Sequence, residues 1–372
     1  MSAVPVNDDP DANPRVIDLS HARLPGNMIS PRGLREIREI LLDADVVHLH
    51  GVWELCNLQV ARLARQLNKP YMVTVHGMLD DWCLRQSRVK KSLFLAVAGN
   101  KYLREASCVH TTAKGERDQV LRRRAGLNIE ILPYLFDEVP FRQRCTPEST
   151  THTRLRAELT LGLCPTRQKR VLFLSRIHHK KGLHSLIESL SILKKRGTSP
   201  QLLIAGTGDQ EYENSIRQQV ARLELTNDVI FLGHATGEKK FAAFEASDLL
   251  AIPTSQENFG LVFVEAMASG LPVLTTRGTD IWPELENAGA CIADGKPEPF
   301  ADAIASLLND AEALPRRGRR GQQWVMDNLN RRLLGARYRD LYWDIGQCVP
   351  ELIYDTPSLI DRARELMPRA AY

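Results

Sequence analysis

The feature that most constrains this chain is an alternation of short apolar, β-rich runs with longer stretches of helical periodicity. In the second half, the expected strands are Val171–Ser175, Leu202–Ala205, Val229–Leu232, Leu249–Pro253, Pro272–Thr275 and Ala290–Ala293. Helices are expected between them, over 183–196, 210–224, 238–246, 260–269 and 298–309. Strands that alternate with helices form parallel sheets with helices on both faces. We therefore expect one complete doubly wound α/β domain in this half.

The first half shows the same alternation less regularly. Its expected strands are Val46–His50, Tyr71–Val75, Cys108–Thr111 and Ile129–Leu132, and its expected helices cover 54–67, 88–105 and 114–124. A Thr-, Arg- and Pro-rich linker with one short helix at 154–163 follows, and further helices are expected at 314–328, 330–346 and 357–366. This predicts an N-terminal domain over 1–165, with 1–15 as a flexible tail, a C-terminal domain over 166–345 and a helical tail over 346–372. We expect that tail to pack back on the N-terminal domain.

Composition excludes several classes of protein. A length of 372 residues suits two domains, and a net charge of +4 is too small for a nucleic-acid-binding protein. The seven cysteines form no C-x-x-C pair, so the spacing predicts neither a zinc site nor a redox pair. No apolar run approaches the roughly 18 residues that would span a bilayer, and residues 1–15 do not resemble a secretion signal. We expect a cytoplasmic protein, with at most peripheral contact with the inner membrane face.

A basic turn follows the first strand of the second half. Residues 175–183 read SRIHHKKGL and lead directly into a helix. A strand-to-helix turn presents backbone N–H groups and the positive end of the helix, and Arg176 and Lys181 add two cationic side chains. This combination suits a diphosphate. The alternative is a solvated basic loop.

Two glycines follow the second strand of the same half. Gly206 and Gly208 stand in the sequence AGTGD, where the absence of a side chain would let a ligand approach the backbone. Ligands of open α/β sheets bind at the carboxyl ends of strands, which favours a ligand here. A simple turn is the alternative.

The most specific motif lies between the fourth and fifth strands. Residues 257–270 read ENFGLVFVEAMASG, so Glu257 lies in a loop, Glu265 lies in the following helix, and Gly270 ends that helix. The helix N-terminus offers free amides near Phe259, Gly260 and Leu261. Carboxylates accept hydrogen bonds from hydroxyl groups and free amides bind anions, so the pattern suits a sugar joined to a phosphate. The alternative for Glu265 is a solvent-facing helical glutamate.

Together these stretches resemble the retaining GT-B glycosyltransferases of family 4. The similarity rests on the three motifs above, on RGTDIWPEL, and on VVHLHGVWE, TVHGM and TTAKGE in the first half, and it covers about 46–345. It implies a GT-B fold, in which two Rossmann-like doubly wound domains face each other across a cleft. It also implies a hexosyltransferase that uses a nucleotide-diphosphate sugar.

The resemblance implies a role for each motif residue. Arg176 and Lys181 would neutralise the donor diphosphate, Glu257 would hold hydroxyls of the donor sugar, and Glu265 would hold the ribose. His76, in TVHGM, would face the reacting sugar from the other domain. The remaining donor-binding residues would be Asn258, Phe259, Gly260 and Leu261, with Gly206, Gly208 and Leu232 on the nucleotide side.

The implied chemistry is metal-free substitution with retention of configuration. Two cations and a helix N-terminus would stabilise the diphosphate leaving group in place of a metal ion, and a donor phosphate oxygen would take the acceptor's proton. No cofactor is expected. A UDP-sugar is the favoured donor, followed by GDP-mannose, and the acceptor would be a glycan or a lipid-linked molecule in cell-surface or exported polysaccharide synthesis.

The acceptor side is the least specific part of the pattern. His50 and Trp53 follow a strand of the first domain and would line the acceptor, although structural packing explains them equally well. The first half also carries basic helix faces, formed by Arg85, Arg88, Lys90 and Lys91 and by Arg122, Arg123 and Arg124. A solvated surface is the ordinary explanation of such faces. Contact with an anionic lipid or a lipid diphosphate is the other.

Two departures from the family pattern bear on activity. No β–loop–α unit is recognisable before Asp45, and Tyr134 and Leu135 stand where the family usually has Asn-Gly. The first departure has three explanations: a start assigned too late, a truncated domain, or completion by another chain. It also supports a second hypothesis, a weak or inactive GT-B protein that binds nucleotide sugar or a partner transferase in a regulatory role. A GT-B epimerase fits the motifs less well.

Overall fold

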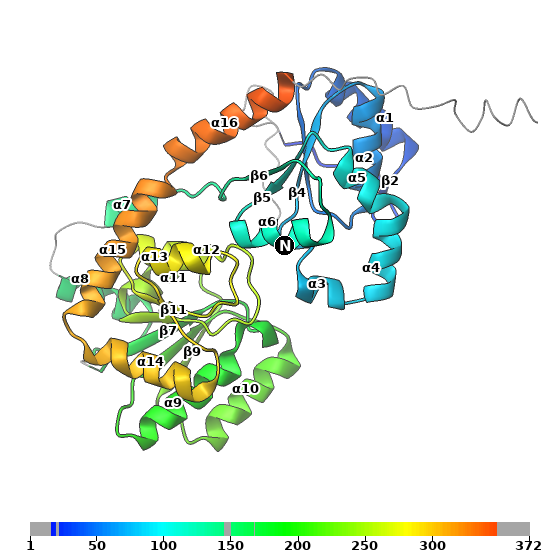
Figure 1. Ribbon diagram of the computed structural model, residues 1–372. Coiled ribbons are helices and arrows are strands. Elements are labelled where there is room, and N and C mark those ends of the chain that lie inside the picture. Colours follow the sequence, from blue (N-terminus) through cyan, green and yellow to red (C-terminus); the bar gives the residue numbers. More distant parts are fainter. Residues whose placement is uncertain (1–15, 20–21, 145–149, 167, 348–372) are drawn as a thin grey trace, which may run out of the picture.

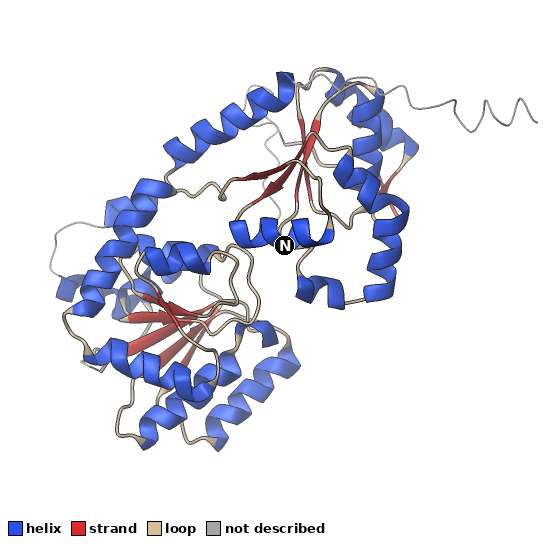
Figure 2. Cartoon of the chain, in the orientation of Figure 1, coloured by secondary structure: helices blue, strands red, loops and turns tan. Residues whose placement is uncertain are grey.

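The computed structural model describes residues 16–19, 22–144, 150–166 and 168–347. Two α/β units lie side by side, each with a parallel sheet between layers of helices (Figures 1 and 2). The expected tail helix at 357–366 and the expected flexible segment 1–15 lie outside the described residues. None of the described helices is long and apolar enough to cross a membrane.

The C-terminal unit contains a six-stranded parallel sheet in the order β12-β11-β10-β7-β8-β9. Its strands are β7 (Arg170–Leu174), β8 (Gln201–Ala205), β9 (Val229–Gly233), β10 (Leu249–Ala251), β11 (Val273–Thr275) and β12 (Cys291–Ile292). Its helices are α9 (Leu183–Lys195), α10 (Gln210–Arg222), α11 (Gly237–Glu245), α12 (Leu261–Ala268), α13 (Trp282–Asn287), α14 (Pro297–Asn309) and α15 (Ala313–Asn328). The strand order reverses beside β7, as it does in a doubly wound sheet. The expectation of six strands is confirmed, with ends shifted by one or two residues.

The N-terminal unit has a four-stranded parallel sheet in the order β3-β4-β5-β6. The strands are β3 (Val47–His50), β4 (Tyr71–Thr74), β5 (Cys108–Thr111) and β6 (Ile129–Ile131). The helices are α2 (Leu55–Gln66), α3 (Asp81–Arg85), α4 (Arg88–Phe94), the π-helical η2 (Leu95–Gly99), α5 (Asn100–Arg104) and α6 (Lys114–Arg123). Among the described residues no strand pairs with the outer side of β3, which is therefore an edge of this sheet.

The sequence pattern predicts no strand or helix before β3, but the structure contains three such elements there. It contains a hairpin of β1 (Arg23–Leu24) and β2 (Met28–Ile29), followed by α1 (Pro31–Leu42). Ser30 caps α1 by accepting a hydrogen bond from the amide of Gly33 at 3.2 Å. The buried residues Ile37 and Leu41 pack this helix into the N-terminal core.

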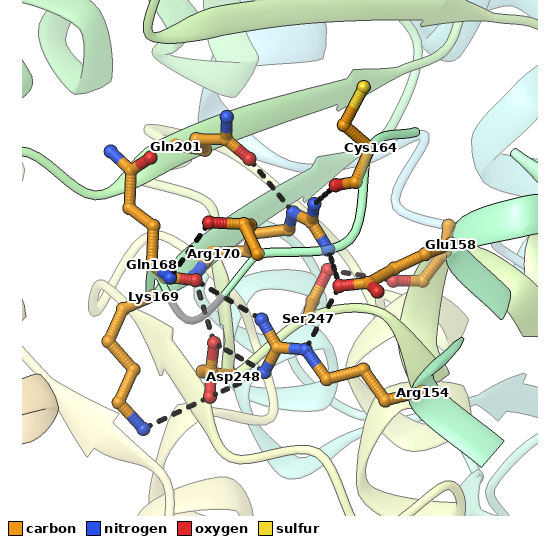
Figure 3. Close-up of polar contacts among 11 residues, drawn as sticks. Arg154, Glu158, Cys164, Gln168, Lys169, Arg170, Gln201, Ser247 and Asp248 are labelled. Atoms are coloured by element: carbon orange, nitrogen blue, oxygen red, sulfur yellow. Dashed lines mark hydrogen bonds and ion pairs between the residues drawn. The ribbon is translucent and has the colours of Figure 1, made fainter. Parts of the chain in front are cut away.

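The linker packs on the C-terminal unit. Helix α7 (Val139–Arg144) places Phe141 against Phe241, and α8 (Thr150–Thr160) lies along α11. Figure 3 shows the polar network that ties α8 to the sheet: the buried Arg170 pairs with the buried Glu158, and Arg154 bridges Glu158 to Asp248. The expected division at 165 puts α7 and α8 in the first domain, whereas these contacts are with the second.

Helix α16 (Arg331–Gln347) begins beside the C-terminal unit and ends on the N-terminal sheet (Figure 1). Ile345 packs there with Met72 and Cys108. The chain thus crosses between the units twice, and the two crossings touch. Phe136 forms a β-bridge with Asn330, and Glu138 accepts a hydrogen bond from the amide of Arg331 at 2.9 Å.

Candidate active site

A pocket of about 520 Å³ lies between the two units. Strand β4 leads into its N-terminal wall, and the loops after β7 and β10 form its C-terminal wall. All of these segments follow the carboxyl ends of parallel strands, where open α/β sheets bind ligands. Seven of the expected site residues line it together: His76, Arg176, Glu257, Asn258, Phe259, Gly260 and Leu261.

The basic turn after β7 is held in place by the loop after β10. The carbonyl oxygen of Lys180 accepts hydrogen bonds from the amide of Ser255 at 2.8 Å and from the hydroxyl of Thr254 at 3.0 Å. Arg176 reaches into the pocket and is otherwise exposed, so its charge is available to a ligand. Lys180 also lines the pocket, with its ammonium group 4.9 Å from the centre of the Trp82 ring. Lys180 belongs to the basic motif, but the motif predicts no role for it.

Lys181 is buried behind this wall and forms an ion pair with Glu257. Burial, and then the neighbouring cations Lys180 and Arg176, lower the pKa of Lys181. The contact with Glu257 opposes that shift by favouring the charged form. Lys181 is the cation expected to bind a phosphate, and Glu257 is the carboxylate expected to bind a sugar. Their ion pair holds both side chains in position.

Gly206 and Gly208 are needed for packing between two loops. A Cβ atom at either position would lie 1.9 Å from a backbone oxygen, that of Ser175 for Gly206 and that of Ile177 for Gly208. The amide of Ile177 donates to the carbonyl of Thr207 at 2.9 Å, which fixes the turn that carries Arg176. Neither glycine lines the pocket between the units; both shape its wall.

The N-terminus of α12 faces the pocket. Gly260, with a φ of 67°, adopts the left-handed conformation that begins this helix, and Leu261 and Val262 line the pocket with it. The amides at such a terminus have no partner within the helix and carry its positive dipole end. This part of the site can accept a phosphate or a sugar oxygen.

Glu265 and Leu232 lie apart from the seven residues that share the pocket. Glu265 is one turn beyond Leu261 on α12 and pairs with Lys240 of α11 at 2.8 Å. Leu232 is buried near the end of β9, and its carbonyl accepts a hydrogen bond from Lys239 at 2.5 Å. Both residues belong to the C-terminal unit alone.

His76 is held by two neighbours in the N-terminal unit. Its Nε2 lies 2.8 Å from Nδ1 of His50, and its Nδ1 lies 2.6 Å from the hydroxyl of Tyr134. Tyr134 in turn meets the ring of Phe259 edge-on, with 5.3 Å between ring centres. Burial, and then the nearby His50 and His110, lower the pKa of His76 to about 4. At neutral pH, His76 is therefore an uncharged, oriented ring in the pocket wall.

The histidine contacts continue to α16. His48 lies 2.8 Å from the hydroxyl of Tyr342 and 2.6 Å from that of Thr74, which lies 2.8 Å from Nδ1 of His110. Burial is the main cause that lowers the pKa of His48 to about 3, with further contributions from His50, His110 and His76. The face of the N-terminal sheet that α16 covers thus combines these neutral, hydrogen-bonded side chains with the apolar contacts of Met72 and Cys108.

The two units also meet through Glu116, Gln256 and Asp80, for which the sequence motifs predict no role. Glu116, at the start of α6, accepts hydrogen bonds from the amide of Gly77 at 2.5 Å and from the side chain of Asn258 at 3.3 Å. Gln256 donates to Asp80 at 2.9 Å. Glu116 lies within TTAKGE, one of the stretches that resemble the family, but Gly77 and Asn258 come from distant parts of the chain.

Of the two expected acceptor-side residues, only His50 approaches the pocket, through His76. Trp53 instead packs against Phe94 with 5.6 Å between rings, and Lys91 lies over its ring at 5.2 Å. Within the described ranges, no three His, Cys, Asp or Glu side chains are placed to hold a metal ion. The charges that face a ligand here are those of arginine, lysine and carboxylate side chains.

Two Rossmann-like domains that share a pocket at the carboxyl ends of their strands define the GT-B class. Solved structures agree with this fold: Anabaena HepE in complex with UDP and glucose superposes with a TM-score of 0.68 at 20% identity, over 84% of this chain and 82% of that chain. Residues 162–324 match the family described as glycosyl transferases group 1, and residues 5–134 match the glycosyl transferase 4-like domain. The chain belongs to the group 1 glycosyltransferase family.

Curated relatives are similar over part of their length. A GDP-mannose-dependent alpha-(1-6)-phosphatidylinositol monomannoside mannosyltransferase from Mycolicibacterium smegmatis is 30% identical over 211 residues, 53% of each chain. A D-inositol 3-phosphate glycosyltransferase from Corynebacterium glutamicum is 32% identical over 169 residues, 44% of this chain and 40% of that one. The chain spans about half the length of these relatives, or less.

Proposed function

We propose that the protein transfers a hexosyl unit from a nucleotide-diphosphate sugar to a glycan or lipid-linked acceptor, with retention of anomeric configuration. The observation that carries this proposal is the convergence of Arg176, the Lys181–Glu257 pair and the N-terminus of α12 at one pocket between the domains. Cations and free amides suit a diphosphate, and a carboxylate suits sugar hydroxyls. Family membership supports the same reaction.

The proposed mechanism uses the charges already in the wall. As the bond between the anomeric carbon and the diphosphate breaks, negative charge develops on the leaving oxygen. Arg176, Lys181 and the α12 amides stabilise that charge from fixed positions, so no metal ion is required. A donor phosphate oxygen takes the acceptor's proton on the same face of the sugar. His76 orients the sugar as a neutral ring and does not act as the base.

Glu265, Leu232, Gly206 and Gly208 form the proposed nucleotide side, with Glu265 holding the ribose. A UDP-sugar is the proposed donor, and the UDP and glucose found in HepE support it. GDP-mannose is the alternative, because the mannosyltransferase relative uses it. The proposed role is in cell-surface or exported polysaccharide synthesis in the cytoplasm, with peripheral contact at the inner membrane face.

One observation favours a second function. Strand β3 is the edge of the described N-terminal sheet, so the β–loop–α unit that normally borders the donor is not seen beside it. A protein built in this way would bind a nucleotide sugar, or a partner transferase, without catalysing sugar transfer. Donor cleavage by the purified protein decides between the two functions: binding without cleavage supports the regulatory one.

The first test is a thermal-shift panel of UDP-, GDP- and ADP-sugars. A donor at 100 times its dissociation constant should stabilise the folded state by about 2.7 kcal/mol. The variant Glu265→Ala should weaken binding roughly 10- to 100-fold, because a charged hydrogen bond is lost. Glu312→Ala, at an exposed position before α15, is the matched control and should bind as the parent does. If no sugar nucleotide shifts the melting temperature, the proposal fails.

A further inference from the structure

The helical run α4–η2–α5 exposes a stripe of large apolar side chains. Val89, Leu93 and Val97 are 83%, 63% and 75% exposed, and they follow one another at intervals of four residues. The run lies on the outer side of the N-terminal unit, away from the C-terminal unit (Figure 1). Side chains of this size rarely stand together in water unless they meet another surface.

The same segment is basic and contains no acid. From Trp82 to Arg104 the sequence has no Asp or Glu, and its six cations are Arg85, Arg88, Lys90, Lys91, Lys101 and Arg104. An apolar stripe on a segment that carries cations and no acid is complementary to an anionic, partly apolar surface. A bilayer with acidic headgroups is such a surface, because it offers acyl chains behind a layer of phosphates.

A basic pocket of about 500 Å³ adjoins the stripe. Leucine side chains and arginines share its lining, which includes Leu84, Leu95, Leu103, Arg85, Arg88 and Arg124. Arg123 lines it too but is paired with Asp81. Within the described part of the chain, Arg85, Arg88 and Arg124 form no ion pair, so three guanidinium groups are free to bind a phosphate, with apolar surface close by.

We propose that this face docks on an anionic bilayer, with Val89, Leu93 and Val97 in the interface and a lipid phosphate headgroup in the arginine pocket. The inference gives a site to the proposed membrane contact, on which it rests, and it is independent of sugar transfer. Helix α3 places the bilayer near the chemistry. Trp82 and Cys83 line the pocket between the domains, while Leu84 and Arg85 line the basic one.

The test is co-sedimentation of the full chain with vesicles, without a sugar nucleotide. We expect binding to phosphatidylcholine vesicles that contain 30 mol% phosphatidylglycerol, about 10-fold or more above binding to phosphatidylcholine alone, and loss of that binding as salt rises. Equal binding to both vesicles, or binding to neither, would overturn the proposal.

Two double variants locate the contact. Arg85→Gln with Arg88→Gln should reduce binding about 10-fold, and Val89→Ser with Leu93→Ser should reduce it at least as much. All four positions are exposed, so folding should be unaffected. The controls are Arg316→Gln with Arg332→Gln, and Leu159→Ser, which is also well exposed on another surface. An equal loss of vesicle binding in the controls would show that binding depends on overall charge or on non-specific apolar contact, and would contradict the proposed site. The thermal shift with sugar nucleotide should be the same in every variant, which separates this test from that of the transferase.

Discussion

The buried side chains of the two sheets differ in polarity. In the C-terminal unit, the central strands are apolar beyond their first residue, as in Val171, Leu172 and Phe173 of β7, all fully buried. In the N-terminal unit, the face under α16 carries His48, His110 and other polar side chains that bond to one another. The first interior makes a rigid platform for charged loops. The second makes a neutral wall whose shape depends on hydrogen bonds.

The largest expected effect concerns ion pairs in the C-terminal unit. We expect a buried pair to contribute several times more to the free energy of unfolding than an exposed pair. Glu158→Ala leaves Arg170 charged and without its carboxylate partner inside the protein, and should cost about 3–5 kcal/mol of unfolding free energy. Asp302→Ala breaks an exposed pair with Arg196 and should cost less than about 1 kcal/mol. Urea unfolding measures both. Equal costs would contradict the assigned role of burial.

A second experiment tests whether Lys181, in the C-terminal unit, stabilises the negative charge that develops on the leaving group. Lys181→Met removes a fixed cation from the leaving-group side and should lower the rate of donor cleavage about 100- to 1,000-fold. Lys195→Met removes an exposed cation at the end of α9 and should leave the rate unchanged. Donor affinity is measured alongside. A loss of affinity with an unchanged maximal rate would show that Lys181 binds the ground state and the transition state equally and does not assist the chemical step.

The smallest effect should appear in the N-terminal unit and should depend on pH. Burial lowers the pKa values of His48 and His76 to about 3 and about 4, so between pH 6.5 and 4 these two side chains bind more protons in the unfolded chain than in the folded one. The stability that they contribute is therefore lost as the pH falls through this window, while the pKa of Asp280, raised by burial to about 7, acts in the opposite direction. For the two histidines alone, we expect the melting temperature to drop by roughly 5 °C between pH 7 and pH 5.

Hydrogen exchange locates that loss of stability. Amides of β3 and α16 should lose protection at pH 5 before those of β7 and β8. His48→Gln should flatten the pH dependence, whereas His234→Gln, at an exposed position in the other unit, should preserve it. Equal loss of protection in both units would contradict the claim that the pH-sensitive side chains act on the N-terminal unit.

Sequence pattern predicted the C-terminal fold well because its strands are continuous apolar runs and its helices have a clear period. The fold of the N-terminal unit was harder to predict from the sequence. Helix α1 was missed, although Ser30 and Pro31 form a typical helix start and Leu34, Ile37 and Leu41 have helical spacing. That α16 packs on the N-terminal sheet follows from contacts across nearly 300 residues of sequence, which periodicity does not reveal.

The candidate site divides in the same way. Motifs within one loop, such as Glu257 to Leu261, predicted neighbours that the structure places in one pocket. Partnerships between loops were not predictable, including Lys181 with Glu257 and Glu116 with Asn258. Nor did the sequence show that Gly206 and Gly208 serve loop packing. These features depend on which strand ends become neighbours in space.

The paired crossings between the units have a mechanical effect. Because Phe136 and Asn330 are bridged and Arg331 is tied to Glu138, both connections leave the C-terminal unit at one place, on the side of the molecule away from α3 (Figure 1). Two links at one place act as a hinge: they permit rotation of one unit about that axis and resist sliding. The displacement grows with distance from the axis, so a small turn there opens or closes the far mouth of the pocket most.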